Sequence, residues 1–535
     1  MSSEGKVDLP DLPDHIDAAV LKIAGVVVIG AIMSILDITV VNVALPTFQT
    51  AFTGADDPLP YSTVAWTVTG YTLALATVIP MTGWAADRFG TKRLYLTAIG
   101  LFTLGSALCA TATSINMLIG FRVLQGFGGG MLMPLGMIIM TKAAGPHRMG
   151  RLMAILGIPM LLGPILGPII GGWLIEHASW HWIFLINVPL GIAAVVYAWI
   201  VLAKDTPEPS ESFDFLGMAL MSPGLALFLF GVSSLPQENG DFSAPRVWIP
   251  MLVGVLLMLA FVWHSFRPEH PLLDLRLFRN RNLAVSIITM FMFAAAFFGG
   301  LLLVPTYFQQ VRGESTLAAG LLVAPQGLGA MITMPIAGRL VDRMPVGRIV
   351  PVGLLLIVVG MFGLTQVTAT TPYGWIIPML VVMGLGMGAT MMPLFTSALK
   401  TLKAHEVARG STLLNINQQI SSSVGIATMS VVLTSHLNDS TIIPGTRRIP
   451  GTDGGITEAA AAILFNTRPQ AFALLGIDPI YVARGLVDAA SAFASTFWVA
   501  WVLVVLTLIP ALLLPRRREE AHLLDDQVQH ARLPD

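Results

Sequence analysis

The chain has 535 residues, of which 55% are hydrophobic and only 11% are charged. Soluble domains carry about 25% charged residues, so this composition excludes an ordinary soluble protein and indicates an integral membrane protein. The net charge of −1 gives no polycationic character, and we expect no nucleic-acid partner. The one cysteine, Cys109, excludes an intrachain disulfide and a cysteine-based metal cluster, and we expect no metal and no cofactor other than a coupling proton.

Residues 1–19 form an acidic N-terminal tail that contains Asp8, Asp11, Asp14 and Asp17. A cleaved signal peptide begins with a basic region, which this tail lacks. We therefore expect the first hydrophobic segment to be retained as a membrane span.

Fourteen stretches are long and apolar enough to cross a bilayer, which takes about 20 residues. The first eight are Val20–Pro46, Val64–Ala86, Leu94–Ala112, Met117–Thr141, Leu152–Ile175, Trp182–Leu202, Phe215–Leu235 and Val247–His264. The other six are Leu283–Phe308, Leu317–Gly338, Ile349–Thr368, Trp375–Leu399, Gly410–Ser435 and Phe493–Leu514. The sequence thus predicts an all-α protein with both termini on one side of the membrane.

Lysine and arginine gather in alternate loops, and such loops are cytoplasmic in membrane proteins. The loops after spans 2, 4, 8, 10 and 12 hold Arg88, Lys92, Arg93, Lys142, Arg148, Arg151, Arg267, Arg276, Arg279, Arg281, Arg343, Arg348, Lys400, Lys403 and Arg409. The intervening short loops hold almost no basic residues. We therefore place both termini, with the C-terminal tail 516–535, in the cytoplasm of a cell-membrane protein.

One outer connection is long, residues 436–491. Its first part is polar and rich in Gly and Pro, which is typical of a solvated loop. The alternative is that Ala471–Leu475 and Tyr481–Val487 form short amphipathic helices on the membrane surface.

Two charges lie deep in the predicted spans: Asp37 in the first and Arg122 in the fourth. A charge at the bilayer centre costs about 2.5–3.5 kcal/mol on insertion scales, so such residues mark functional sites by default. Because the two spans run antiparallel, both charges fall at a similar depth in the outer half, within reach of each other. Burial and a neighbouring guanidinium act in opposite directions on a carboxyl group, which suits one that loads and releases a proton. The alternative is a static buried pair that only fixes packing.

The two halves of the chain share a repeat. The segment Gly83–Arg93 follows the second span, and Gly338–Arg348 holds the matching place in the second half, both with a Gly-x-x-x-Asp-Arg pattern. Parallel repeats of this kind occur in transporters.

Five motifs in the expected order make the chain resemble the major facilitator superfamily, in particular its 14-span drug:proton antiporter branch. They are Leu36–Pro46, Gly83–Arg93, Arg122–Gly126, Gly157–Gly172 and Trp182–Gly191. Two positions depart from that branch: His181 and Gln418 stand where it often carries a basic residue.

The resemblance implies a major facilitator fold with 14 transmembrane helices. Two six-helix halves, 20–202 and 267–515, would flank two inserted transmembrane helices at 203–266. It also implies alternating access, with Asp37 and Arg122 coupling transport to a proton.

Further motif residues take roles from the same resemblance. A latch that closes the cytoplasmic side would consist of Gly83, Asp87, Arg88, Gly90 and Arg93, with Asp342 and Arg343 in the second copy. For the latch cations alone, a purely topogenic role is the alternative. The antiporter motif would consist of Pro159, Gly163, Pro164, Gly167, Pro168 and Gly171, a bent helix face that limits leakage; the alternative is plain close packing of small residues.

Candidate cargo contacts are aromatic and polar residues on helices expected to line the cavity: Asn42, Trp66, Tyr71, Gln125, Phe293, Phe297, Tyr307, Asn417 and Gln418. Aromatic faces can hold organic cations. Packing is the alternative for the aromatic residues, and bonding between helices is the alternative for the amides.

The sequence thus predicts a proton-coupled antiporter that exports lipophilic, often cationic drugs. The alternative within the fold is an exporter of a specific lipid, lysolipid, siderophore or antibiotic. A receptor or assembly subunit is disfavoured because the latch and antiporter motifs are both present. An intramembrane enzyme is excluded by the lack of a paired nucleophile and base. The expected partners are the cargo, the proton and the bilayer, and the resemblance leaves room for an envelope adaptor protein.

Overall fold

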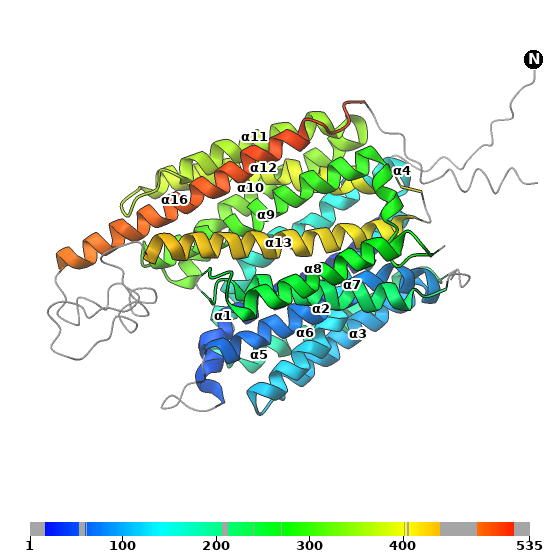
Figure 1. Cartoon of the computed structure of the whole chain (residues 1–535), viewed down its shortest axis with the longest axis horizontal. Helices are drawn as coiled ribbons and strands as arrows, with labels where there is room; N and C mark the ends of the chain where they lie inside the picture. The colour runs from blue at the N-terminus through cyan, green and yellow to red at the C-terminus, as the bar shows by residue number, and fades with distance from the viewer. Residues whose placement is uncertain are drawn as a thin grey trace, which may run out of the picture.

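The computed structural model describes residues 17–52, 59, 61–205, 212–238, 240–268, 270–400, 402–403, 406–438 and 479–517. These residues form a bundle of long helices (Figure 1). The first part of the chain gives α1 (Ala18–Ala51), α2 (Tyr61–Phe89), α3 (Thr91–Cys109), α4 (Ile115–His177), α5 (His181–Leu185) and α6 (Asn187–Val201). The helices α7 (Phe215–Ser234) and α8 (Pro245–Ser265) correspond to the pair predicted to be inserted between the halves, and they are called the inserted pair below. After the short 3-10 helix η1 (Leu275–Arg279) come α9 (Arg281–Gln310), α10 (Thr316–Arg343), α11 (Val346–Leu364), α12 (Tyr373–Lys400), α13 (Val407–Asn438) and α16 (Pro479–Ala511).

Polar side chains start many of these helices. Asp17, Ser114, Asp214, Asn280 and Ser315 each accept a hydrogen bond from a backbone N–H in the first turn of the helix that follows. Such caps satisfy donors that the helix itself leaves unpaired. These capping residues therefore determine where the helices begin.

Among the described residues, twelve helical segments are long and apolar enough to cross a membrane. Two of the fourteen predicted spans fall outside this set: the third corresponds to α3, and the fifth to the second part of α4.

The helix α4 covers both the fourth and the fifth predicted spans without a helical break. As a straight rod its 63 residues would reach about 95 Å at 1.5 Å per residue. Its two arms, however, run in opposite directions along α1: Gln125 and then Gly136 approach Asp37 and Val27, whereas Gly163 and then Gly171 approach Ile35 and Val40. The chain therefore folds back between a first arm (115–143) and a second arm (148–177), as two antiparallel spans require.

The sixth predicted span is one segment, His181–Val201, in which the helical hydrogen bonding is interrupted at Ile186 between α5 and α6. The prediction for the end of the outer loop needs correction. The residues 481–487, considered as a surface helix, are the start of α16, which begins at Pro479. The helix α16 thus begins well before Phe493, where the last span was predicted to start. Buried small and aromatic side chains, among them Ala489, Ala490 and Phe493, stabilise this earlier part of the helix. The stretch Ala471–Leu475 lies outside the described residues.

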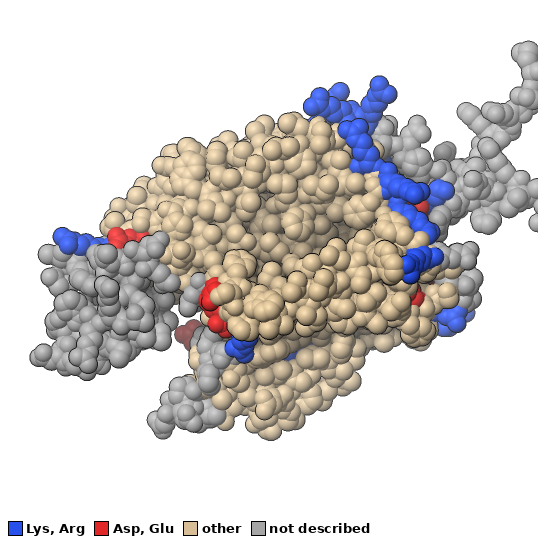
Figure 2. All heavy atoms as spheres, in the orientation of Figure 1, with Lys and Arg blue, Asp and Glu red and all other residues tan. Residues whose placement is uncertain are grey.

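Basic residues gather at one end of the bundle (Figure 2), which we call the basic end. There α2, α10 and α12 finish in turns that contain Arg88, Arg343 and Lys400. The opposite end is called the far end.

The two halves meet along two matching seams. At one, α2 packs against α13; at the other, the second arm of α4 packs against α10. The close approaches described between the halves lie toward the basic end: Gly83 faces Ala408, Gly150 faces Gly338, and the Asn415 amide contacts Met137. The helix α7 lies beside both α2 and α13, over the first seam (Figure 1).

Candidate functional site

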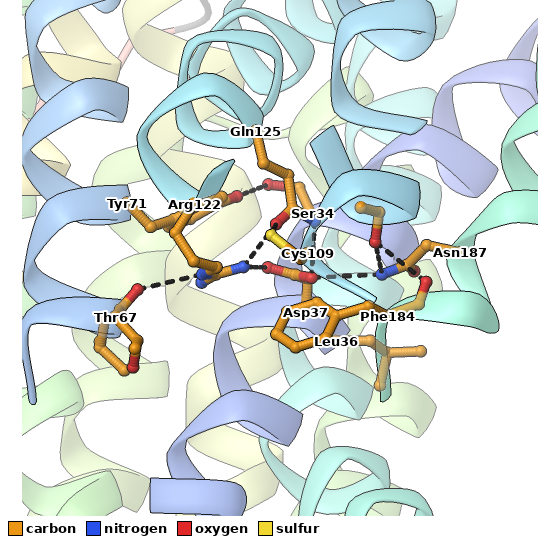
Figure 3. A network of polar contacts seen from close by, with 12 residues as sticks. Ser34, Leu36, Asp37, Thr67, Tyr71, Cys109, Arg122, Gln125, Phe184 and Asn187 are labelled. Carbon is orange, nitrogen blue, oxygen red and sulfur yellow. Dashed lines mark hydrogen bonds and ion pairs between the residues drawn. The ribbon is translucent and has the colours of Figure 1, made fainter. Parts of the chain in front are cut away.

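The carboxylate of Asp37 lies at the centre of a buried polar network (Figure 3). Its Oδ2 forms an ion pair with Nη1 of Arg122. Its Oδ1 accepts hydrogen bonds from Nε2 of Gln125 at 2.8 Å and from Nδ2 of Asn187 at 3.2 Å. All three partners are therefore donors, the arrangement that stabilises an ionised carboxylate.

The guanidinium of Arg122 is held from three sides. Its Nε donates to the Thr67 carbonyl at 3.0 Å, and its Nη1 donates to Gln125 Oε1 at 2.7 Å as well as to Asp37. Its Cζ lies 4.1 Å from the centre of the Tyr71 ring, close enough for a cation–π interaction. The buried Nη2 finds no hydrogen-bond partner among the described residues.

Glycines allow the helices to meet closely enough to form this network. A Cβ atom on Gly105 of α3 would lie 2.7 Å from the Cβ of Gln125. One on Gly126 of α4 would lie 2.9 Å from the Cβ of Ala74 on α2. Real Cβ atoms do not approach so closely, so α4 can lie against α2 and α3 only where these glycines stand.

The network is sealed in this conformation. Asp37 is 2% exposed and Arg122 is 0% exposed. Both side chains are therefore shielded from solvent in this arrangement of the helices.

The glycine stripe of the antiporter motif packs on α1 at the level of this carboxylate. A Cβ on Gly163 or Gly167 would overlap Ile35 or Thr39, which lie on either side of Asp37 in sequence. The hydroxyl of Thr39 also donates to the Gly163 carbonyl at 3.1 Å. Pro159 is buried, and the side chains of Pro164 and Pro168 lie outside the described residues.

The predicted latch segment lies at the basic end. Gly83 packs against the start of α13, and Gly90 has φ +93°, a conformation that favours glycine. Asp87 is half-buried, and Arg88 and Arg93 are exposed.

Asp205 joins the latch from the end of the first half. Its carboxylate accepts from the backbone N–H of Lys92 at 2.8 Å and of Arg93 at 2.9 Å, and so caps α3. Sequence reasoning missed this residue; an acid placed directly after a span was the available signal.

In the second copy, Asp342 joins the two halves. It accepts from the backbone N–H of Gly150 at 3.0 Å and from Nε of Arg151 at 3.3 Å, both at the start of the second arm of α4. The neighbouring Arg343 is exposed. This contact reaches directly across the seam between α4 and α10.

The residues predicted to contact cargo do not form one group. Tyr71 and Gln125 belong to the Asp37 network. The others are dispersed: Trp66 stacks on Phe230 of α7, Phe293 stacks on Phe297, Tyr307 donates to the Thr368 carbonyl, Asn417 donates to the Ile287 carbonyl, and Asn42 is exposed. The buried Oε1 of Gln418 has no hydrogen-bond partner among the described residues.

Sequence reasoning also missed Asn187 and Thr67 as parts of the network. Thr67 contributes a backbone carbonyl, which no side-chain pattern signals. Asn187 lies within the motif Trp182–Gly191, but sequence reasoning assigned it no role in the site. Within the described part of the chain, no cluster of three His, Cys, Asp or Glu residues could hold a metal ion.

Comparison with known proteins agrees with this architecture. The chain is 47% identical over 528 residues to the "Multidrug resistance protein B homolog" of Mycobacterium tuberculosis, covering 98% of this chain and 93% of that protein. It is 30% identical over 429 residues to the "Multidrug export protein EmrB" of Haemophilus influenzae, covering 77% and 82% of the two chains. The solved proton:xylose symporter XylE shares the fold, with a TM-score of 0.57 at 14% identity, covering 95% of this chain and 99% of that one.

The model of one family matches most of the chain, residues 27–426. Together with the helical bundle, its two matching seams and relatives that are named as transport proteins, this match defines what kind of protein it is. The chain belongs to the Major Facilitator Superfamily, and it is a multi-pass membrane transporter.

Proposed function

We propose that the protein is a proton-coupled antiporter that exports lipophilic, often cationic compounds from the cytoplasm by alternating access. The observation that carries the proposal is the buried carboxylate of Asp37, which is paired with Arg122 and surrounded by donors alone. The names of the relatives, multidrug resistance and multidrug export proteins, support the class of cargo.

The donor-only surroundings make proton binding a switch. A protonated carboxyl group has an O–H that needs an acceptor, but Arg122, Gln125 and Asn187 all present N–H groups to Asp37. A bound proton therefore cannot be accommodated without breaking at least one contact. An unmade hydrogen bond in a buried site costs about 1–3 kcal/mol, which is enough to shift a two-state equilibrium.

The rearrangement that resolves this mismatch involves Gln125. If its amide turns, Oε1 can accept the new O–H at Oδ1 of Asp37, but Arg122 then loses Gln125 Oε1 as an acceptor. Arg122 would keep Oδ2 of Asp37 only as a neutral carbonyl oxygen, together with the Thr67 carbonyl and the Tyr71 ring. Proton loading is thus expected to loosen the packing of α4 against α1.

With the basic end in the cytoplasm, the described conformation is the one that is closed to the cytoplasm. In the cycle we propose, Asp37 takes a proton from outside and cargo leaves. The halves then rock, the proton is released inward, and new cargo enters. For a neutral cargo, one inward charge returns about 2.3 kcal/mol per 100 mV, which supports somewhat more than tenfold accumulation at 1.4 kcal/mol per tenfold. A monovalent cation such as ethidium exchanges for the proton without net charge movement, so the pH difference alone drives its export.

The experiment uses inverted membrane vesicles and ethidium as the probe cargo. Asp37→Asn keeps the size of the side chain and removes the titrating group, and we expect it to abolish pH-gradient-driven uptake while the protein remains in the membrane. Asp241→Asn makes the same change at an exposed loop residue and should transport like the wild type. Full pH-driven transport by Asp37→Asn would refute the coupling assignment. A panel of lipophilic cations, neutral drugs and lysolipids then defines the cargo.

A further inference from the structure

Asn187 binds the proposed proton site from a third direction. Its Nδ2 donates to Oδ1 of Asp37 at 3.2 Å and to Oγ of Ser106 at 3.2 Å, and the residue is only 3% exposed. Figure 3 shows Asn187 on the side of the carboxylate opposite to Arg122. The uncharged amide of Asn187 is thus the one donor to Asp37 among these three that does not come from α4; the other two, Arg122 and Gln125, do.

The orientation of this amide is fixed by its neighbours. The hydroxyl of Ser106 donates to the Phe184 carbonyl at 3.0 Å. Since its one proton is used there, Ser106 presents only lone pairs to Asn187. The amide must therefore turn its nitrogen toward Ser106 and Asp37, and it can act only as a donor to the carboxylate.

Asn187 also lies at a break between two helices. It is the first residue of α6, directly after the turn at Ile186 that ends α5. Pro189 has no N–H to offer the Leu185 carbonyl four residues earlier, so the helical hydrogen bonding is interrupted here, although Ile186 keeps a right-handed helical backbone with φ −59° and ψ −31°. The amide therefore lies at a point where the helix lacks a backbone hydrogen bond.

We propose that Asn187 is a positioning residue that sets how tightly Asp37 holds its proton and transmits the charge state of Asp37 to the α5–α6 junction. This inference rests on the proposed function, in which Asp37 is the proton carrier. While Asp37 is ionised, the Asn187 amide is held to it. Protonation weakens that bond, and Ser106 then remains the hydrogen-bond acceptor of the Asn187 amide.

Few other groups near Asp37 can titrate or carry charge. They are Arg122 on α4, Tyr71 on α2 and Cys109 on α3, and the described residues of α5 and α6 that contact the network are uncharged. A change at Asn187 consequently acts on Asp37 by removing one neutral donor, with the charges around it unaltered.

The test is an infrared pH titration of the purified protein in lipid. The Asp37 carboxyl band is identified as the one that is missing from Asp37→Asn. Asn187→Leu keeps the number and branching of the side-chain heavy atoms and removes both N–H donors, so the ionised form loses a stabilising bond. We expect the midpoint of the Asp37 titration to rise by about one pH unit, given the usual strength of a hydrogen bond to a charged group.

Two further variants keep the result interpretable. Asn415→Leu makes the same change at a buried amide that donates to Ser411 and Met137 instead, and it should leave the midpoint where it is. Ser106→Ala removes the acceptor that orients the Asn187 amide. It should raise the midpoint of the Asp37 titration by less than Asn187→Leu does, and it replaces that variant if Asn187→Leu does not fold.

An unchanged midpoint in both Asn187→Leu and Ser106→Ala would overturn the inference. That result leaves the proposed function intact as long as Asp37→Asn loses proton-driven transport. Conversely, if Asp37→Asn still couples transport to protons, the proposed function fails whatever the midpoints are.

Discussion

At the scale of single residues, Asp37 and Arg122 depend on each other more than their charges alone suggest. Three donors surround the carboxylate, and two side-chain oxygens and one carbonyl accept from the guanidinium. Removing either charge leaves the other buried without its counter-charge, which typically costs about 3–5 kcal/mol.

This dependence predicts that the stability of the protein and its proton-coupled transport can be lost separately. Arg122→Ala should lower the unfolding temperature of the purified protein and abolish transport. Asp37→Asn with Arg122→Gln removes both charges and keeps hydrogen-bonding groups, so its stability should return close to that of the wild type while coupling stays absent. Thermal unfolding and vesicle transport measure the two quantities. A double variant as unstable as Arg122→Ala would show that the pair is not the source of the loss.

At the scale of elements, the glycine stripe of α4 fixes the distance between α4 and α1. Gly163→Ala should destabilise the protein by about 1–3 kcal/mol, the usual cost of overpacking, because the new methyl group would overlap Ile35. Gly172→Ala, on the same helix with no atom within 4 Å of its added Cβ, is the matched control and should be neutral. Combining Gly163→Ala with Ile35→Ala should recover part of the loss in a thermal unfolding assay. Equal effects of the two glycine substitutions would rule out close packing as the reason for the stripe.

The inserted pair of helices is joined to the first half at three levels along α2. Phe213 packs on Trp84 with ring centres 4.4 Å apart, Ser222 donates to the Thr77 carbonyl at 2.7 Å, and Phe230 stacks on Trp66 at 5.5 Å. At the basic end, Asp214 accepts from His264 at 2.8 Å and from the backbone N–H of Leu272 at 3.1 Å, which ties the pair to the segment before α9.

These contacts predict that α7 and α8 move with the first half. A crosslink between Thr77→Cys and Ser222→Cys should therefore be tolerated during transport. A disulfide between Gly240→Cys and Val431→Cys joins the pair to α13 at the far end, since an added Cβ at Gly240 lies 3.7 Å from that of Val431. Gly240 has φ +81°, which strains any side chain there, so the reduced double variant is the reference for transport. That disulfide should stop transport until it is reduced. Transport that continues with the second disulfide intact would mean that the pair moves with the second half.

At the scale of the whole molecule, Asp342 holds the seam between α4 and α10 closed. Asp342→Asn replaces a charged acceptor for Gly150 and Arg151, and bonds to charged groups are worth about 1.5–3 kcal/mol. The open state at the basic end should rise in population by about tenfold or more. Labelling of Thr412→Cys, which is buried at the other seam, should accelerate accordingly. An unchanged labelling rate would show that the two seams open independently.

The sequence predicted most of this architecture because membrane spans leave a simple record of apolar length. The orientation that the alternating basic loops indicate stays a prediction. It could not predict that helical residues lead directly from the fourth span into the fifth, or that the helical hydrogen bonding is interrupted at Ile186, because those features depend on packing between helices. Asp37 and Arg122 were recognisable because deep charges are costly. Asn187 was not, since a neutral amide costs little in a span and gains its role only from what it contacts. The predicted cargo residues are dispersed because aromatic side chains serve packing as readily as binding.

The central claim is that the proton exchanged during transport is carried by Asp37. Its most direct test is proton movement driven by a cargo gradient across liposomes that contain the purified protein, with no pH difference imposed at the start. The wild type should move protons opposite to ethidium, and Asp37→Asn should bind ethidium without moving protons. Proton flux in Asp37→Asn equal to that of the wild type would contradict the account.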